Sequence, residues 1–154
     1  DLTGPLIALG AEVNLEGATS GVFPVSDYLT QKELKSQTLI TEVILPDQEW
    51  ESWYYREGIT QNDHPGFTIS ILTRREEDTL KNFRIVITGH TKRFKRITKV
   101  EEALKGRKIN QLELNGITAG LELKFASAKG MSSDYIRHLA ETQLERGLHE
   151  LLKP

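Results

Sequence analysis

Two spacings of apolar residues divide the chain into a first part typical of strands and a second part typical of helices. Before residue 98, apolar and polar residues alternate in several short runs. This alternation predicts strands at 11–15, 21–25, 38–45, 50–56, 67–72 and 83–88, with short helices or turns at 2–10 and 27–29. The last two strands flank the charged run 75–78, so they predict an antiparallel hairpin with one more apolar face.

From Thr98 onward the apolar period lengthens to that of a helix. Thr98 and Glu101 have the spacing of a capping box, and Gly106 is a stop signal, which together predict one short helix. The same spacing begins again at Asn110 and Glu113 and predicts a second helix, with apolar residues as far as Phe125 and an end at Lys129-Gly130.

The last helix is predicted to begin at Ser132 or Ser133, either of which can cap its first turn. Its apolar residues fall on one stripe: Ile136, Leu139, Ala140, Leu144, Leu148 and Leu151. Strands followed by helices are the order of an α+β fold. We therefore expect an antiparallel sheet packed with two to three helices, preceded by a small β-rich region.

Composition narrows the classes of function. The chain has 154 residues, 20 basic and 22 acidic, so its formal net charge of -2 favours neither nucleic acid nor a membrane surface. The absence of cysteine excludes disulfides, thiolate metal sites and cysteine nucleophiles. The sequence has no apolar run near the roughly 20 residues that span a bilayer, and no signal-peptide pattern at its beginning. A cytoplasmic location is the expectation.

The stretch 53–66 carries the most suggestive chemistry. Trp53 and Tyr55 share one face of an extended segment, and Tyr54 and Arg56 share the other. Aromatic faces beside a fixed cation suit a flat, electron-rich, anionic ligand. The same residues also fit a strand with an aromatic core face and a solvated arginine, which composition alone favours.

Other candidate sites have less support. The four histidines are scattered without metal-ligand spacing, and the sequence has no nucleophile motif or carboxylate dyad, so we expect no metal ligands and no catalytic residues. The region Lys92–Lys108 is locally basic. It supports a rival hypothesis, a non-catalytic binding or assembly module for an acidic partner or nucleic acid. The slightly acidic total charge and the scarcity of aromatic residues there argue against nucleic acid.

Five stretches, taken in order, resemble the C-terminal part of the flavin-binding subunit of molybdenum hydroxylases. This is the xanthine dehydrogenase and carbon monoxide dehydrogenase flavoprotein family. The stretches are Asp1–Ala11, Leu39–Pro46, Tyr55-Arg56, Val100–Gly106 and Ser133–Ala140, the last followed by Arg146. The resemblance runs from Asp1 to Leu152, and it rests on the order and spacing of these motifs.

The resemblance implies an oxidoreductase in which FAD passes electrons from iron–sulfur clusters to an acceptor such as NAD. It implies two partners, a molybdopterin-binding subunit and a 2Fe–2S subunit. It also implies two regions: residues 1–57 as a remnant of the second FAD-binding subdomain, and residues 58–154 as the flavoprotein C-terminal α+β domain.

By the same resemblance, three residues are cofactor-binding. Asp1 falls where an aspartate approaches the ribityl or phosphate region of FAD, and Ile40 falls where an apolar residue lies against the isoalloxazine ring. Arg56 falls where the family usually carries a lysine near the flavin. The stretch Ile59–Pro65 replaces an arginine-rich stretch of the family, so the electron acceptor stays open.

The glycine-rich pyrophosphate-binding segments precede Asp1 in the family and are absent from this sequence. We therefore expect the chain to be a piece of a longer protein. We also expect it to fold, to bind little FAD by itself and to be inactive alone.

Overall fold

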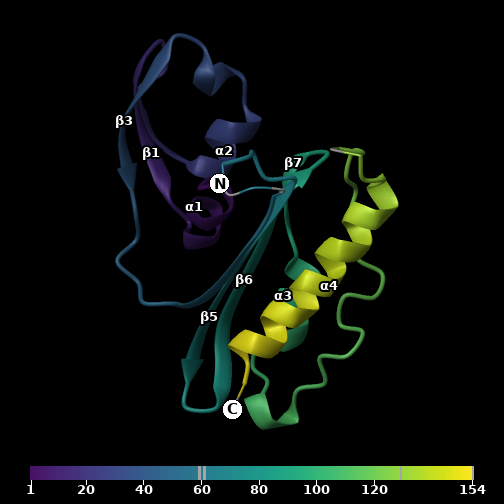
Figure 1. The fold of residues 1–154 in the computed structure, drawn as a ribbon. Helices are drawn as coiled ribbons and strands as arrows, with labels where there is room; N and C mark the ends of the chain where they lie inside the picture. The colour runs from purple at the N-terminus through teal and green to yellow at the C-terminus, as the bar shows by residue number, and fades with distance from the viewer. Residues whose placement is uncertain (59, 61, 129, 154) are drawn as a thin grey trace. The chain divides into compact units, whose positions relative to one another are not determined.

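The computed structural model describes residues 1–58, 60, 62–128 and 130–153 (Figure 1). They form two compact units, one of residues 2–48 and one of residues 49–154 to which Asp1 also belongs. The division falls earlier than the boundary expected after residue 57, because the strand Glu51–Glu57 (β4) pairs with the strand that follows it.

The unit of residues 2–48 is a small three-stranded antiparallel sheet with short helices. Its elements are α1 (Thr3–Leu9), β1 (Glu12–Gly17), β2 (Gly21–Pro24), α2 (Val25–Thr30), η1 (Glu33–Lys35) and β3 (Thr38–Ile44), and its strand order is β2-β1-β3. Its small core consists of Ala11, Val13, Leu15, Val25 and Leu34. The alternation predicted at residues 11–15 is confirmed, since Val13 and Leu15 are buried while Glu12 and Glu16 are exposed.

The unit of residues 49–154 is built on a four-stranded antiparallel sheet in the order β4-β5-β6-β7. The strands after β4 are β5 (Phe67–Glu76), β6 (Thr79–His90) and β7 (Arg93–Arg96), and the helical elements are α3 (Thr98–Leu104), η2 (Ile109–Gln111) and α4 (Ser133–Leu151). In the predicted hairpin, Ile69 lies opposite Ile87 and Ile71 opposite Ile85, so these four side chains share one face of the sheet.

The core of this unit lies between that face and the two helices α3 and α4 (Figure 1). Leu144 and Leu148 of α4 and Val100 and Leu104 of α3 belong to the same buried cluster as the four isoleucines. The stripe predicted on the last helix is therefore confirmed in its buried part. The predicted start is confirmed as well, because the Ser132 side chain caps the helix and accepts a hydrogen bond from the Tyr135 N–H at 3.2 Å.

The helix predicted over residues 110–125 is wrong. The structure has one 3-10 turn, η2, followed by irregular chain. Gly116 and Gly120 have φ values of 71° and 73°, a left-handed conformation that a helix interior excludes. Leu121 and Phe125 are buried with Leu123 between them, so this part of the chain follows an extended, two-residue period. Residue 129, where that helix was predicted to end, lies outside the described residues.

The capping box predicted at Thr98 and Glu101 is also wrong, although α3 does begin at Thr98. The residue before the helix is Ile97, and it makes no side-chain cap. The Glu101 carboxylate turns inward instead, accepts the Ile85 N–H at 2.7 Å and pairs with Arg96 at 2.9 Å. Glu101 therefore ties α3 to β6 and β7 rather than closing its own helix end.

Candidate functional site

The aromatic side chains of β4 belong to the core. Trp53 and Tyr55 stack with ring centroids 6.0 Å apart, and Tyr55 lies 5.8 Å from the ring of buried Phe67. The Trp53 indole N–H donates to Glu150 of α4 at 2.8 Å. The expected pairing of Trp53 and Tyr55 on one face is confirmed, and that face is packed against the helices rather than open to a ligand.

The phenol of Tyr55 donates its hydrogen to the carboxylate of Glu57. Burial, reinforced by this hydrogen bond and by the charge of Glu57, raises the pKa of Tyr55 to about 12. Tyr55 therefore stays protonated at neutral pH and acts there as a hydrogen-bond donor.

Arg56 and Asp1 come together on the other face of β4. The Arg56 Nε lies 3.3 Å from each carboxylate oxygen of Asp1, and the Tyr54 hydroxyl donates to the Asp1 carbonyl at 3.3 Å. Arg56 Nη1 donates to the carbonyl of Thr60 at 3.2 Å, and Nη2 donates to that of Asp63. Two of the three predicted cofactor-binding residues are thus direct partners.

The third predicted residue, Ile40, lies on β3 in the unit of residues 2–48. It pairs with Leu15, and the neighbouring Val43 pairs with Val13. Leu15 and Val13 are buried, whereas Ile40 is 40% exposed and Val43 is 51% exposed. The face that carries the small core is therefore uncovered at β3, and it presents an apolar surface there.

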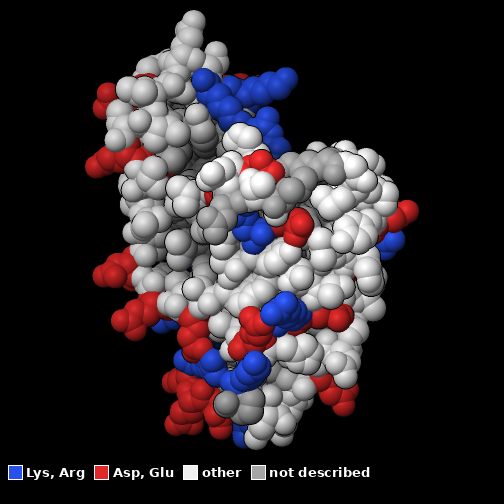
Figure 2. All heavy atoms as spheres, viewed as in Figure 1, with Lys and Arg blue, Asp and Glu red and all other residues white. Residues whose placement is uncertain are grey.

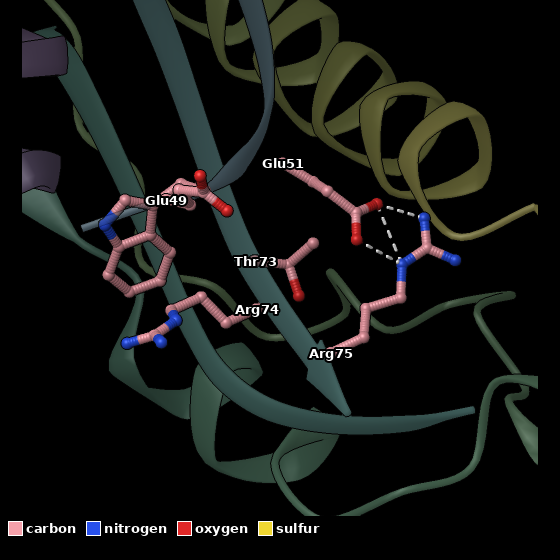
Figure 3. Close-up of a pocket in the computed structure, with 6 residues that line it drawn as sticks. Glu49, Glu51, Thr73, Arg74 and Arg75 are labelled. Carbon is pink, nitrogen blue, oxygen red and sulfur yellow. Dashed lines mark hydrogen bonds and ion pairs between the residues drawn. The ribbon is translucent and has the colours of Figure 1, made fainter. Parts of the chain in front are cut away.

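A separate pocket of about 520 Å³ lies at the far end of the β4–β5 pair (Figure 3). It is lined by Glu49, Trp50, Glu51, Thr73, Arg74 and Arg75. Most of these side chains already bind one another or their neighbours. Glu51 and Arg75 point toward each other and form an ion pair, Thr73 donates to a backbone carbonyl, and two arginine side chains lie over the Trp50 ring.

The sequence analysis missed this pocket. Arg75 belongs to the charged run 75–78 between the two predicted strands, and its partner Glu51 lies 24 positions away. Arg75 is a diagonal neighbour of Glu51, whose direct partner across the strands is Thr73, and this proximity is known only once the register is known.

Three cations of the basic region Lys92–Lys108 have partners within the chain. Lys95 donates to the carbonyl of Glu122 at 2.6 Å, Arg96 pairs with Glu101, and Lys99 donates to the carbonyl of Ala119. In the lower part of Figure 2, acidic and basic side chains lie side by side on the face displayed. The cations of this region thus serve in part to hold the irregular chain and α3, which weakens the rival hypothesis.

Buried His90 ends β6, two residues before this region. Its Nδ1 accepts the Lys92 N–H at 3.2 Å, and its ring meets the edge of Phe125. Burial, followed by the nearby charge of Lys95, lowers the pKa of His90, so the imidazole is neutral at neutral pH. The part of the chain that the structure describes holds no cluster of three or more potential metal ligands, and none of its helices is long and apolar enough to cross a membrane.

The unit of residues 49–154 is an α+β domain with a four-stranded antiparallel sheet, and the ion pair of Asp1 and Arg56 lies on its first strand, β4. Residues 54–151 match the family model of the CO dehydrogenase flavoprotein C-terminal domain, and the chain therefore belongs to this family. The resemblance and the α+β fold class inferred from the sequence are both confirmed.

Solved structures of similar fold agree. Quinoline 2-oxidoreductase from Pseudomonas putida 86 has a TM-score of 0.81 at 13% identity, over 99% of this chain and 55% of that chain. Carbon monoxide dehydrogenase from Hydrogenophaga pseudoflava has a TM-score of 0.82 at 18% identity, over 98% and 55%. Reconstituted CO dehydrogenase from Oligotropha carboxidovorans has a TM-score of 0.81 at 16% identity, over 99% and 56%.

At these identities the likeness shows the fold alone. The chain spans about half the length of the solved chains that it matches. No curated protein sequence matches it.

Proposed function

We propose that the chain is part of the FAD-binding subunit of a molybdenum-hydroxylase-type oxidoreductase. The observation that carries the proposal is the family match over residues 54–151. It is supported by the fold shared with carbon monoxide dehydrogenase, one structure of which is described as lacking the Mo-pyranopterin moiety of its molybdenum cofactor. In this proposal, electrons pass from iron–sulfur clusters through FAD to an acceptor such as NAD.

Each unit, taken by itself, carries residues that fit part of a flavin site. The uncovered apolar face at Ile40 suits a flat ring, since burying it removes apolar surface from water. The Asp1 carboxylate, held by Arg56, can accept hydrogen bonds from ribityl hydroxyls. When bound, FAD supplies the electron transfer that side chains lack. Residues 1–57 would then be a remnant of the second FAD-binding subdomain, and residues 58–154 the C-terminal domain.

The flavin content of two purified polypeptides tests the proposal. The polypeptide translated from the whole gene is expected to carry about one FAD per chain, because it would supply donors for the pyrophosphate. The 154-residue chain is expected to fold and to carry little FAD, because a few contacts do not offset the cost of ordering a large ligand. A flavin-free whole polypeptide would overturn the proposal.

The proposed partners are a molybdopterin-binding subunit and a 2Fe–2S subunit, in a cytoplasmic complex. The check is co-purification of the whole polypeptide from its own cells, followed by assay of molybdenum and iron. We expect both metals in the complex. Their absence from a flavin-containing preparation would refute the assigned partners and leave the flavin assignment standing.

A further inference from the structure

We propose that Arg56 is a positioning residue, which arranges Asp1 and the described residues of the β4–β5 loop (58, 60 and 62–66) through the shape of its guanidinium. The resemblance assigns to this position a cation near the flavin. The contacts of Arg56 point to a different role. The Asp1 carboxylate balances its charge, and its planar guanidinium fixes the positions of Asp1, Thr60 and Asp63. The functional part of this inference rests on the proposed flavin site.

All three nitrogens of the guanidinium have acceptors, and these come from two parts of the chain, Asp1 and the β4–β5 loop. Nε faces the Asp1 carboxylate, Nη1 the Thr60 carbonyl and Nη2 the Asp63 carbonyl. A guanidinium offers five N–H donors in a fixed plane, whereas a lysine offers one nitrogen at the end of a flexible stem. Lysine at this position would therefore keep the positive charge but could not donate to all three acceptors in the same geometry.

Gly58 provides a second, independent observation. A Cβ built on Gly58 would overlap Arg56 Nη1 and would lie 3.2 Å from the Thr60 carbonyl oxygen. The absence of a side chain at Gly58 thus leaves the space that the guanidinium fills. At the base of the loop, the Gly66 N–H donates to the Glu57 carbonyl at 2.8 Å.

The neighbouring strand leaves space for the loop base as well. Gly89, with φ at 78°, has no side chain where a Cβ would overlap the Gly66 carbonyl oxygen. The loop is therefore closed at its base, and Arg56 holds it at Thr60 and Asp63. The side chain of Arg56 is 21% exposed, and of its hydrogen bonds the one to the Asp63 carbonyl is partly buried.

The first test uses the 154-residue chain without flavin. Amide hydrogen exchange at Gly66, measured by NMR, reports the closure of the loop. We expect Arg56→Lys to speed this exchange about tenfold, because hydrogen bonds to a charged group are lost. Gly58→Ala should have a similar effect although residue 56 is still arginine, because the added methyl group displaces the guanidinium.

The double variant separates positioning from general destabilisation. If both substitutions act on the same set of contacts, Arg56→Lys with Gly58→Ala should exchange no faster than the single variants. Arg75→Lys is the matched control, because Arg75 also pairs with a carboxylate on this sheet, and it should leave exchange at Gly66 unchanged. Parent-like exchange in Arg56→Lys, or additive effects in the double variant, would overturn the proposal.

The second test measures FAD affinity in the whole polypeptide. Arg56→Lys and Gly58→Ala should weaken it by the same factor, because both displace Asp1 and the loop. If Arg56→Lys keeps the parent affinity while Arg56→Gln loses it, the charge is what matters and the positioning role is wrong. A parent polypeptide without flavin would refute the proposed function instead, and the exchange test would still decide the role of Arg56.

Discussion

The two units of the chain differ sharply in how far they bury their own apolar residues. Among the described residues, the core of the second unit (49–154) has twenty buried members, which come from its sheet, its helices and the irregular chain between them. The core of the first unit (2–48) has five. On the first unit, Leu39, Val43 and Leu45 are each more than half exposed, on or just beyond β3. An apolar edge strand of this kind is normally covered by another element.

The comparison indicates that residues 49–154 carry most of the stability of the chain, because apolar burial is the main favourable term in folding. The first unit buries fewer apolar residues, so its stability by itself is expected to be lower. That division also separates the proposed flavin contacts, with Asp1 and Arg56 on the stable unit and Ile40 on the other. The following predictions test the difference between the units, beginning with the largest expected effect.

Leu144→Ala should lower the free energy of unfolding by about 2–5 kcal/mol, since Leu144 is fully buried among the helices and the sheet. Urea denaturation followed by circular dichroism measures this. Leu39→Ala, on the exposed part of β3, is the matched control and should change stability by less than about 0.5 kcal/mol. Equal losses in the two variants would mean that the structure misplaces the core.

Glu101→Ala should cost about 1.5–3 kcal/mol, because it leaves the buried Ile85 N–H without its carboxylate acceptor. Glu102→Ala, one residue further along α3 and exposed, should be nearly neutral. Thr98→Ala should also be nearly neutral, as no capping box forms. A loss of stability in Thr98→Ala comparable to that in Glu101→Ala would show that the capping box does form.

Gly147→Ala should destabilise the second unit by about 1–3 kcal/mol, although alanine favours a helix interior. The added Cβ would overlap the Trp53 ring, which packs directly on Gly147. The combination with Trp53→Leu should recover part of the loss, because a smaller side chain leaves room for the methyl group. Thermal unfolding of the two variants would show this, and a more stable Gly147→Ala protein would contradict the packing of β4 on α4.

The smallest expected effect is a pH dependence from His90. Its pKa is lowered in the folded state, so the unfolded chain binds more protons once the pH falls below about 6.5. The stability contributed by neutral His90 is therefore complete above that pH and is lost as the pH falls through the lowered pKa. Between pH 7 and pH 5, His90→Asn should show a shallower fall in stability than the parent, and His138→Asn, on an exposed position of α4, should match the parent.

Much of this fold could be predicted from local pattern. The alternation of apolar and polar residues predicts β5 and β6, and a serine cap followed by an apolar stripe predicts α4. Both signals come from residues that are close in the sequence. The false helix over residues 110–125 shows the limit of this reasoning. The apolar residues Leu114, Leu121 and Phe125 fit a helical spacing, yet their burial is set by contacts with the distant sheet, and Gly116 and Gly120 take left-handed conformations.

The candidate site was less accessible to sequence reasoning. The assignment of Asp1, Ile40 and Arg56 as cofactor-binding residues came from the family resemblance, and their contacts with FAD are still predictions. The partnership of Asp1 with Arg56 joins positions 55 residues apart, which no local period reports. The buried role of Glu101 was hidden for a similar reason, because its partners lie on β6 and β7.

Native-state hydrogen exchange of the 154-residue chain tests the difference between the units most directly. Amides of β5 and β6 should exchange only through global unfolding, while those of β1 and β3 should open about a hundredfold more often, by local unfolding of the smaller unit. Denaturant should accelerate the two sets with different slopes, since they expose different amounts of surface. A single exchange free energy shared by β1, β3, β5 and β6 would contradict the account.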